Sequence, residues 1–462
     1  MTEAQNTGSF RDPSGFVFQQ DGVVYRQVNN VYSEDYDYLI CSGLYSVLIG
    51  FGLLVPHKEV DPISVGCKDA YKVLQPEPVK TISYPYEWCF SQLKDAAITT
   101  LKIQKIALGY GMTLKDASAY NIQFMDGKPT LIDTLSFERY KDREPWGAYK
   151  QFCQHFLAPL ALMAYNDARL SQLLRIHMDG IPLDLASSLL PLHTRLNLSL
   201  LLHIHLHSRS QKRYADKDMN EKVLKRGIGM TSLFGLVDNL KSCIEKMKWH
   251  PKDSEWQGYY DDDSYSVEAL SHKRGIVVGL LGKIRPKLVW DLGANTSHLA
   301  SNMGLQTIAF DIDPACVETS YLIAKKRNKT NILPLLLDLT NPSPGIGWEN
   351  KERTPIWERS HADTVMALAL IHHLAISNNV PLGRLAQFFG SICETLIIEF
   401  IPKSDPKVQK LLATRKDVFP NYTQEGFEGE FGRVFQVQEC IPIKDSQRVL
   451  YLMQKRSNIE AV

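Results

Sequence analysis

Three acidic side chains end three successive apolar segments in the C-terminal half of the chain. Asp291 leads into Gly293, Asp311 comes twenty residues after Asp291, and Asp338 ends the third segment. An acidic residue at the end of a parallel strand is placed to bind ribose hydroxyls, and glycine lets the backbone approach a ligand closely. The pattern indicates a nucleotide-type cofactor site. The alternative, a plain strand-to-turn connection, is weaker because three acidic strand ends follow in order.

This constellation resembles the class I S-adenosylmethionine-dependent methyltransferases. The resemblance implies that the first strand end holds the methionine part of S-adenosylmethionine, the second binds the ribose and the third lies beside the adenine. Ser297 stands where the family usually has a second glycine. A nicotinamide cofactor is less favoured, because the Gly-x-Gly-x-x-Gly motif is absent. The expected cofactor-binding residues are Asp291, Gly293, Asn295, Ser297, Asp311, Asp313, Asp338 and Leu339.

Two histidines and a glutamate are the candidate catalytic residues. His372 and His373 follow the fourth predicted strand, whose end faces the transferred methyl group in this fold. Methyl transfer is an in-line displacement that needs alignment and exclusion of water, and a neutral histidine is able to take the proton of a hydroxyl or amine acceptor. A histidine that only shapes the pocket is the alternative. Glu399 ends the fifth strand, where it orients a histidine, binds a cationic substrate group or forms a structural ion pair.

The N-terminal half carries a second pattern, in which Asp116 and Asn121 precede a strand, a glycine turn, another strand and Asp133. It resembles the protein-kinase and aminoglycoside-phosphotransferase superfamily. The resemblance implies that Asp116 faces an acceptor hydroxyl, while Asn121 and Asp133 hold Mg²⁺ on ATP. No glycine-rich loop is found at 15–22, and Arg26 is the nearest basic residue to the expected third-strand lysine. The alternative is a plain β-turn-β unit with surface acids.

The surrounding pattern predicts two folded domains and a connector. Residues 1–215 read as a two-lobed α+β, kinase-like domain with a hairpin at 15–28, short strands at 71–74 and 80–84, and helices at 39–54 and 87–110. Residues 216–262 read as a helical connector. Residues 263–462 read as an α/β Rossmann-like methyltransferase domain, because short apolar runs of this kind are typical of parallel strands buried on both faces. These runs are 287–290, 306–310, 332–337, 363–371 and 396–400, followed by strand candidates 434–437 and 448–453.

Composition limits the remaining possibilities. The formal net charge is +1, which makes nucleic acid an unlikely partner and favours a small-molecule substrate, although tRNA stays open through a local basic patch. The absence of an apolar span or signal core predicts a cytoplasmic protein without a membrane partner. The eight cysteines form no Cys-x-x-Cys pair, so no metal site is expected. His203 and His207 share a helical face, but a packed helix is the favoured interpretation. The sequence does not indicate an oligomeric state.

The order of the two regions, kinase-like and then methyltransferase-like, resembles bacterial methyltransferases related to rhizobial nodulation host-specificity proteins. Three hypotheses follow. The first is an S-adenosylmethionine-dependent methyltransferase acting on a small molecule or metabolite. The second is an ATP- and Mg²⁺-dependent phosphotransferase, alone or bifunctional with the methyltransferase. The third is a non-enzymatic scaffold whose two sites have decayed.

Overall fold

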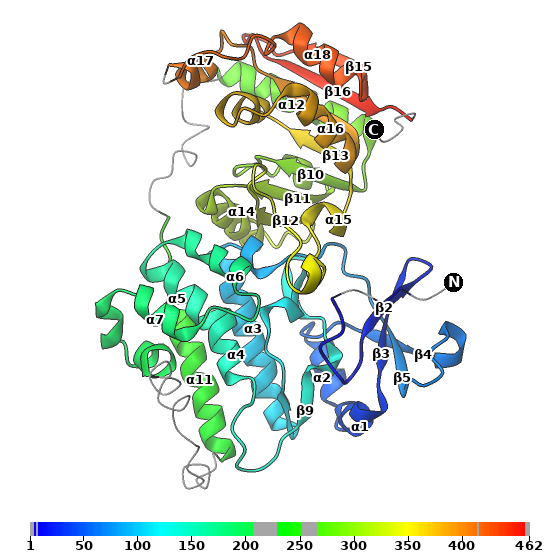
Figure 1. Ribbon diagram of the computed structural model, residues 1–462, viewed down its shortest axis with the longest axis vertical. Coiled ribbons are helices and arrows are strands. Elements are labelled where there is room, and N and C mark those ends of the chain that lie inside the picture. The colour runs from blue at the N-terminus through cyan, green and yellow to red at the C-terminus, as the bar shows by residue number, and fades with distance from the viewer. Residues whose placement is uncertain (1–3, 6–7, 207–228, 252–265, 414, 458–462) are drawn as a thin grey trace. The chain divides into compact units, whose positions relative to one another are not determined.

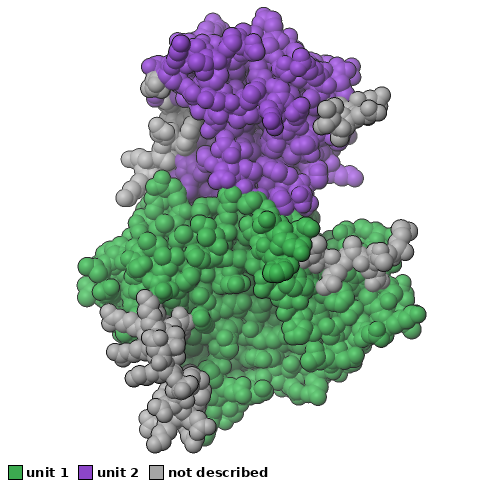
Figure 2. Space-filling view, viewed as in Figure 1, with its two compact units in different colours: residues 1–250, 344–354 green, residues 251–343, 355–462 purple. Residues whose placement is uncertain are grey.

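The computed structural model describes residues 4–5, 8–206, 229–251, 266–413 and 415–457 (Figure 1). The chain folds into two compact units, which Figure 2 colours green and purple. The first unit comprises residues 1–250 together with 344–354, and the second comprises 251–343 together with 355–462. Within the described ranges, no helix is both long enough and apolar enough to cross a membrane.

An antiparallel sheet of five strands, in the order β1-β2-β3-β5-β4, opens the first unit. The predicted hairpin is confirmed, and Asp21 and Gly22 take the positive φ that its two-residue turn requires. Residues 80–84 do not form the predicted strand. The amide of Ser83 donates to the side chain of Gln123 and its carbonyl accepts from the same side chain, so neither group pairs with another strand. The strands are β1 (Ala4–Gln5), β2 (Val17–Gln20), β3 (Val23–Val28), β4 (His57–Val60) and β5 (Lys72–Pro76).

Helices and two small hairpin-like sheets complete this unit. The single helix expected at 39–54 is two helices, since Gly43 has a φ of 82° and interrupts the helical backbone. The long predicted helix is confirmed as α3 (Phe90–Gly109). Strand β6 pairs with β9, and β7 pairs with β8 around a turn at Asp126 and Gly127. The remaining elements are α1 (Ser33–Cys41), α2 (Leu44–Gly50), β6 (Met112–Leu114), β7 (Ile122–Met125), β8 (Lys128–Leu131), β9 (Phe137–Arg139), α4 (Tyr149–Phe152), α5 (Ala158–Tyr165), α6 (Leu173–Ile176), α7 (Leu183–Leu189) and α8 (Leu198–Leu200).

The helix of the predicted connector belongs to the first unit. Helix α11 (Met230–Lys246) buries Leu233, Val237 and Leu240, and Figure 1 shows it beside α3. Lys105 of α3 binds Asp238 at 2.6 Å. The predicted boundaries 1–215, 216–262 and 263–462 therefore differ from the observed division, because the apolar face of α11 is buried against the first unit rather than exposed in a linker.

A mixed seven-stranded sheet forms the second unit, in the order β12-β11-β10-β13-β14-β16-β15. The first five strands in this order are parallel, and β16 runs antiparallel to both of its neighbours. Each predicted strand of this half has an observed counterpart, although the one predicted at 363–371 ends at Ala367, and the sheet is Rossmann-like as expected. The strands are β10 (Leu288–Leu292), β11 (Gln306–Asp311), β12 (Ile332–Leu336), β13 (Ala362–Ala367), β14 (Cys393–Phe400), β15 (Phe435–Pro442) and β16 (Val449–Lys455).

Helices cover both faces of this sheet. Apolar residues of α12 pack with Val289, Met366 and Ile397 in one core cluster. Trp290 points to the opposite face, where its ring meets those of Phe310 and Trp357. The helices are α12 (Val267–Ile284), α13 (Leu299–Asn302), α14 (Pro314–Lys326), α15 (Ile356–Arg359), α16 (Leu382–Ile392), α17 (Pro406–Leu412) and α18 (Gln424–Gly432).

Candidate functional site

The loop after β10 is built for close approach at the carboxyl edge of the sheet. Gly293 has a φ of 70°, and a Cβ atom placed on it would lie 3.3 Å from the side chain of Leu370. Asn295 has a φ of 50°, a left-handed conformation that asparagine tolerates better than most residues. The amides of Gly293 and Ala294 both donate to the carbonyl of Phe310. The turn is thus tied to the neighbouring strand end.

Asp311 joins the first two predicted parts of the cofactor site. Its carboxylate accepts hydrogen bonds from the backbone amides of Asn295 at 2.7 Å and Asp313 at 2.9 Å. Asp313 caps α14 by accepting from the amide of Ala315 at 2.8 Å. The structure therefore brings together the residues that were predicted to hold the methionine part and the ribose. Asp311 also organises the loops, a role that sequence spacing alone did not indicate.

The third strand end lies next to the second. The amide of Leu337 donates to the carbonyl of Asp311 at 2.9 Å, which extends the pairing of β11 with β12. Asp338 is half-buried and accepts from the amide and the hydroxyl of Thr340. Leu339 beside it is also half-buried. In the loop after β10, the amide of Ser297 donates to the carbonyl of Ala294. Three acidic strand ends thus lie in the expected order on adjacent strands.

Burial makes the carboxylates of this edge unusually easy to protonate. Loss of hydration, together with the nearby charge of Asp311, raises the pKa of Asp291 to about 7. Burial likewise raises the pKa of Asp311 to about 6, against the opposing effect of its two amide hydrogen bonds. A cationic ligand would favour the charged form of both groups. The electrostatics of the edge therefore suit a positively charged cofactor.

This burial predicts a measurable pH dependence of stability. Because the pKa of Asp291 is higher in the folded chain than in the unfolded one, the folded state is destabilised as pH rises from about 4 to about 7. We expect Asp291→Asn to raise the thermal midpoint of the ligand-free protein most at pH 8, less at pH 5, and hardly at all below about pH 4. Asp445→Asn, an exposed turn substitution, serves as the control. Equal midpoints for wild type and Asp291→Asn at pH 8 would contradict the assignment.

His372 and His373 follow β13 in a short π-helical segment that runs to Ser377. His372 is fully buried, and neither of its ring nitrogens has a hydrogen-bond partner among the described residues. Burial, together with nearby His373 and the cations Arg448 and Lys273, lowers the pKa of His372 far below its usual value, and burial lowers that of His373 to about 4. Both rings are therefore neutral at physiological pH.

The strand predicted at 363–371 ends early for a reason that involves Glu399. Strand β13 stops at Ala367, and Ala369 has a φ of 52° while its amide donates to the Glu399 carboxylate at 2.8 Å. Lys273 of α12 binds the same carboxylate oxygen at 2.7 Å. Of the alternatives for Glu399, the structure contains the ion pair. A catalytic role for Glu399, as for the two histidines, stays a prediction.

A second polar cluster brings together the kinase-like residues of the first unit. Hydrogen bonds from Asn121 and Gln151 reach Asp116, whose pKa is raised mainly by burial and further by the charge of Asp133. Asp133 forms an ion pair with Arg26 at 3.0 Å and accepts from the hydroxyl of Ser136 at 2.8 Å. The carboxylate that was predicted to hold Mg²⁺ is therefore paired with arginine.

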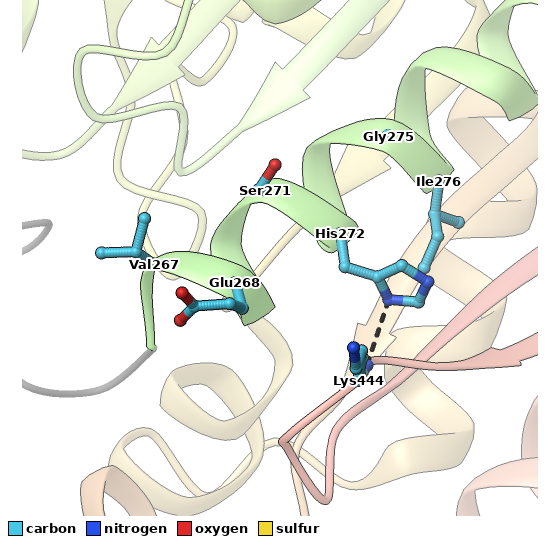
Figure 3. Close-up of a pocket in the computed structure, with 7 residues that line it drawn as sticks. All are labelled: Val267, Glu268, Ser271, His272, Gly275, Ile276 and Lys444. Carbon is cyan, nitrogen blue, oxygen red and sulfur yellow. Dashed lines mark hydrogen bonds between the residues drawn. The ribbon is translucent and has the colours of Figure 1, made fainter.

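Two other features lie away from these sites. His203 bonds to Tyr149 and Asn239, while His207 lies outside the described residues. In the part of the chain that is described, no group of three or more His, Cys, Asp or Glu side chains is arranged to hold a metal ion. A hollow of about 790 Å³ lies along α12. Figure 3 shows the residues that line it, among them His272, which accepts a hydrogen bond from the backbone amide of Lys444. The hollow contains no predicted site residue.

Sequence reasoning missed Lys273 and Arg448, the two cations beside the predicted Glu399, and it missed Arg11, which pairs with Glu352. Each of these ion pairs joins residues that are far apart in the sequence. Lys273 sits on the otherwise apolar buried face of α12, and that placement is the one signal that sequence periodicity offered.

No protein-family model matches the chain. Nodulation protein NoeA of Rhizobium meliloti (strain 1021) is 34% identical over 459 residues, which cover 97% of this chain and 95% of NoeA.

Similar solved structures include the 16S rRNA methylase RmtB, with 15% identity and a TM-score of 0.29, covering 41% of this chain and 64% of RmtB. An rRNA methylase from Escherichia coli has 13% identity and a TM-score of 0.29, and the match covers 56% of this chain and 89% of the methylase. The methyltransferase domain of bacterial CtHen1 has 15% identity and a TM-score of 0.28, and the match covers 40% of this chain and 99% of that domain. The prediction that nucleic acid is an unlikely partner is contradicted, because two of these structures are of rRNA methylases.

Proposed function

This chain belongs to the family of nodulation protein NoeA. We propose that its second unit is an S-adenosylmethionine-dependent methyltransferase. One observation carries the proposal: Asp291, Asp311 and Asp338 end three adjacent parallel strands. The chain passes from β12 to β13 across the central β10, so the strand order reverses there. Ligands of open α/β sheets bind at the carboxyl ends of strands beside such a reversal.

The residues of this edge fit the cofactor chemically. S-adenosylmethionine supplies a methyl group on a sulfonium cation. Asp291 is buried near a second carboxylate, and a bound cation would offset the energetic cost of its negative charge. We assign Asp291, Gly293, Asn295 and Ser297 to the methionine part, Asp311 and Asp313 to the ribose, and Asp338 with Leu339 to the adenine.

The proposed catalytic groups follow β13 and lie near the end of β14, at the same carboxyl edge of the sheet. His372 is neutral, so its imidazole has a nitrogen lone pair that is able to accept the proton of an oxygen or nitrogen acceptor, although burial makes it a weaker base than an exposed histidine. His373 shapes the adjoining wall, and Glu399 holds the turn at Ala369 in place. An open cavity of about 610 Å³ begins at Ala375, two residues after His373, and extends to Tyr422. We assign the acceptor to this cavity, whose volume lies within the usual range for ligand sites.

A phosphotransferase is the second candidate, and the Arg26–Asp133 ion pair weighs against it. Mg²⁺ would have to displace a guanidinium from the carboxylate that is meant to bind it. We therefore propose no ATP or Mg²⁺ site at Asp133 and assign the first unit a supporting role.

Calorimetry with S-adenosylhomocysteine tests the cofactor assignment. We expect the wild-type protein to bind it and Asp311→Ala to weaken binding roughly 10- to 100-fold, because charged hydrogen bonds to the ligand and the loop amides are lost. Asp445→Asn provides an acid-to-amide control on the exposed surface of the same unit. Absence of binding, or equal affinity in wild type and Asp311→Ala, would refute the proposal.

A further inference from the structure

Residues 344–354 leave the second unit and fold against the first, although both flanking segments belong to the second unit. We call this segment the arm. Ile346 and Arg353 exchange two backbone hydrogen bonds across it, at 3.1 and 3.2 Å. Gly347 has a φ of 82°, and a Cβ atom there would lie 2.4 Å from the Glu352 carboxylate. The arm is thus an ordered turn with its own backbone pairing.

A buried carboxylate anchors the arm. The Glu352 side chain is only 1% exposed and accepts two hydrogen bonds from the Arg11 guanidinium, at 2.5 and 2.9 Å. It also accepts from the amide of Trp348 at 2.6 Å. Gly8 runs so close that a Cβ atom on it would lie 2.3 Å from the Glu352 carbonyl oxygen. A two-pronged arginine contact of this kind is among the stronger ion pairs, and burial of Glu352 limits its screening.

A second contact joins the arm to the kinase-like loop. The guanidinium of Arg353 lies over the ring of Tyr120, 4.5 Å from its centre. The next residue, Thr354, donates its amide to the hydroxyl of Tyr84 at 3.2 Å. Tyr120 immediately precedes Asn121, so the arm rests on the loop whose residues carry the kinase-like pattern. Such a cation–π contact is attractive because the guanidinium charge faces the electron-rich face of the ring.

We propose that docking of the arm on the first unit pre-orders the adenine side of the cofactor site, with Arg11 and Glu352 as positioning residues. The inference rests on the proposed function. The arm begins five residues after Leu339, and Asp338 already bonds to Thr340 within the joining stretch. When the arm is docked, this stretch is held at both ends before the cofactor binds. Less conformational freedom is then lost on binding, which raises affinity.

Arg11→Ala and Glu352→Gln test the coupling by opening the anchor. We expect faster amide hydrogen exchange at Ile346 and Arg353 and an S-adenosylhomocysteine affinity about 5- to 20-fold weaker, the lower range of typical coupling between sites. Glu349→Gln on the exposed tip of the same arm is the matched control and should change neither quantity. Arg11→Lys, which keeps the charge with fewer donors, should restore part of the affinity.

The outcomes separate this inference from the proposed function. If wild type binds S-adenosylhomocysteine and the opened variants bind it equally well despite faster exchange in the arm, the coupling is wrong. If exchange is unchanged in Arg11→Ala, Glu352→Gln and Arg353→Ala, the anchoring is wrong. If wild type does not bind at all, the proposed function fails first and this inference falls with it. Near-ultraviolet circular dichroism confirms that each variant is folded.

Discussion

Replacing Glu399 with alanine should lower the free energy of unfolding of the second unit by about 3–5 kcal/mol, the usual cost of breaking a buried ion pair by removing one partner. Glu399 is fully buried, and its carboxylate binds Lys273 at 2.7 Å and the amide of Ala369 at 2.8 Å. Arg448 lies 3.8 Å from its other oxygen. The substitution removes the carboxylate that binds the buried ammonium of Lys273, whereas Arg448 keeps its ion pair with Asp405 at 2.6 Å.

Urea unfolding of the ligand-free protein measures this effect. Glu394 lies on the same strand, and its exposed carboxylate is 3.7 Å from the ammonium of Lys455. We expect the control substitution Glu394→Gln to change the free energy of unfolding by less than about 0.5 kcal/mol. Glu399→Gln should fall between the two, because its amide oxygen still accepts from Ala369 while the charge is gone. A loss below about 1 kcal/mol for Glu399→Ala would show that the ion pair contributes little to folding.

The predicted strands of the second unit succeed because a parallel sheet buried on both faces demands uninterrupted apolar runs, and such runs are visible in the sequence. The early end of β13 was not predictable in the same way. Residues 368–371 are as apolar as the strand before them. The strand nevertheless ends where Ala369 takes a positive φ and its amide bonds to the Glu399 carboxylate, thirty residues further on.

The arm and the helix of the connector illustrate the same limit. Arg11 and Glu352 are 341 residues apart, so neither their spacing nor their local context indicates a contact. The apolar face of α11 was visible, but its partner surface on α3 was not, and a polar segment with one helix looked like a linker. Local pattern thus predicted the elements and the acidic strand ends, while the cations that stabilise or position them come from tertiary contacts.

Replacing His372 with asparagine should lower methyl transfer by about 10²- to 10⁴-fold, the range attributed to a lost general base, while S-adenosylhomocysteine affinity stays within about threefold of wild type. Transfer is measured with methyl-labelled S-adenosylmethionine and a cell extract that is afterwards separated into small-molecule and RNA fractions. The labelled fraction of the wild-type reaction also reports the class of acceptor. The low pKa of His372 predicts that this group gives no loss of activity between about pH 6 and 9.

The alternative for His372, a side chain that only shapes the pocket, predicts a different pattern. A shape role is largely retained by His372→Gln, whose amide reaches a similar position, whereas a proton acceptor is not replaced by an amide. His361→Asn, an exposed histidine of the same unit, should match wild type. Activity within tenfold of wild type in both His372 variants would therefore exclude His372 as the base. An equal loss of transfer and of S-adenosylhomocysteine affinity would instead mean that the buried ring supports the cofactor loop near Leu370.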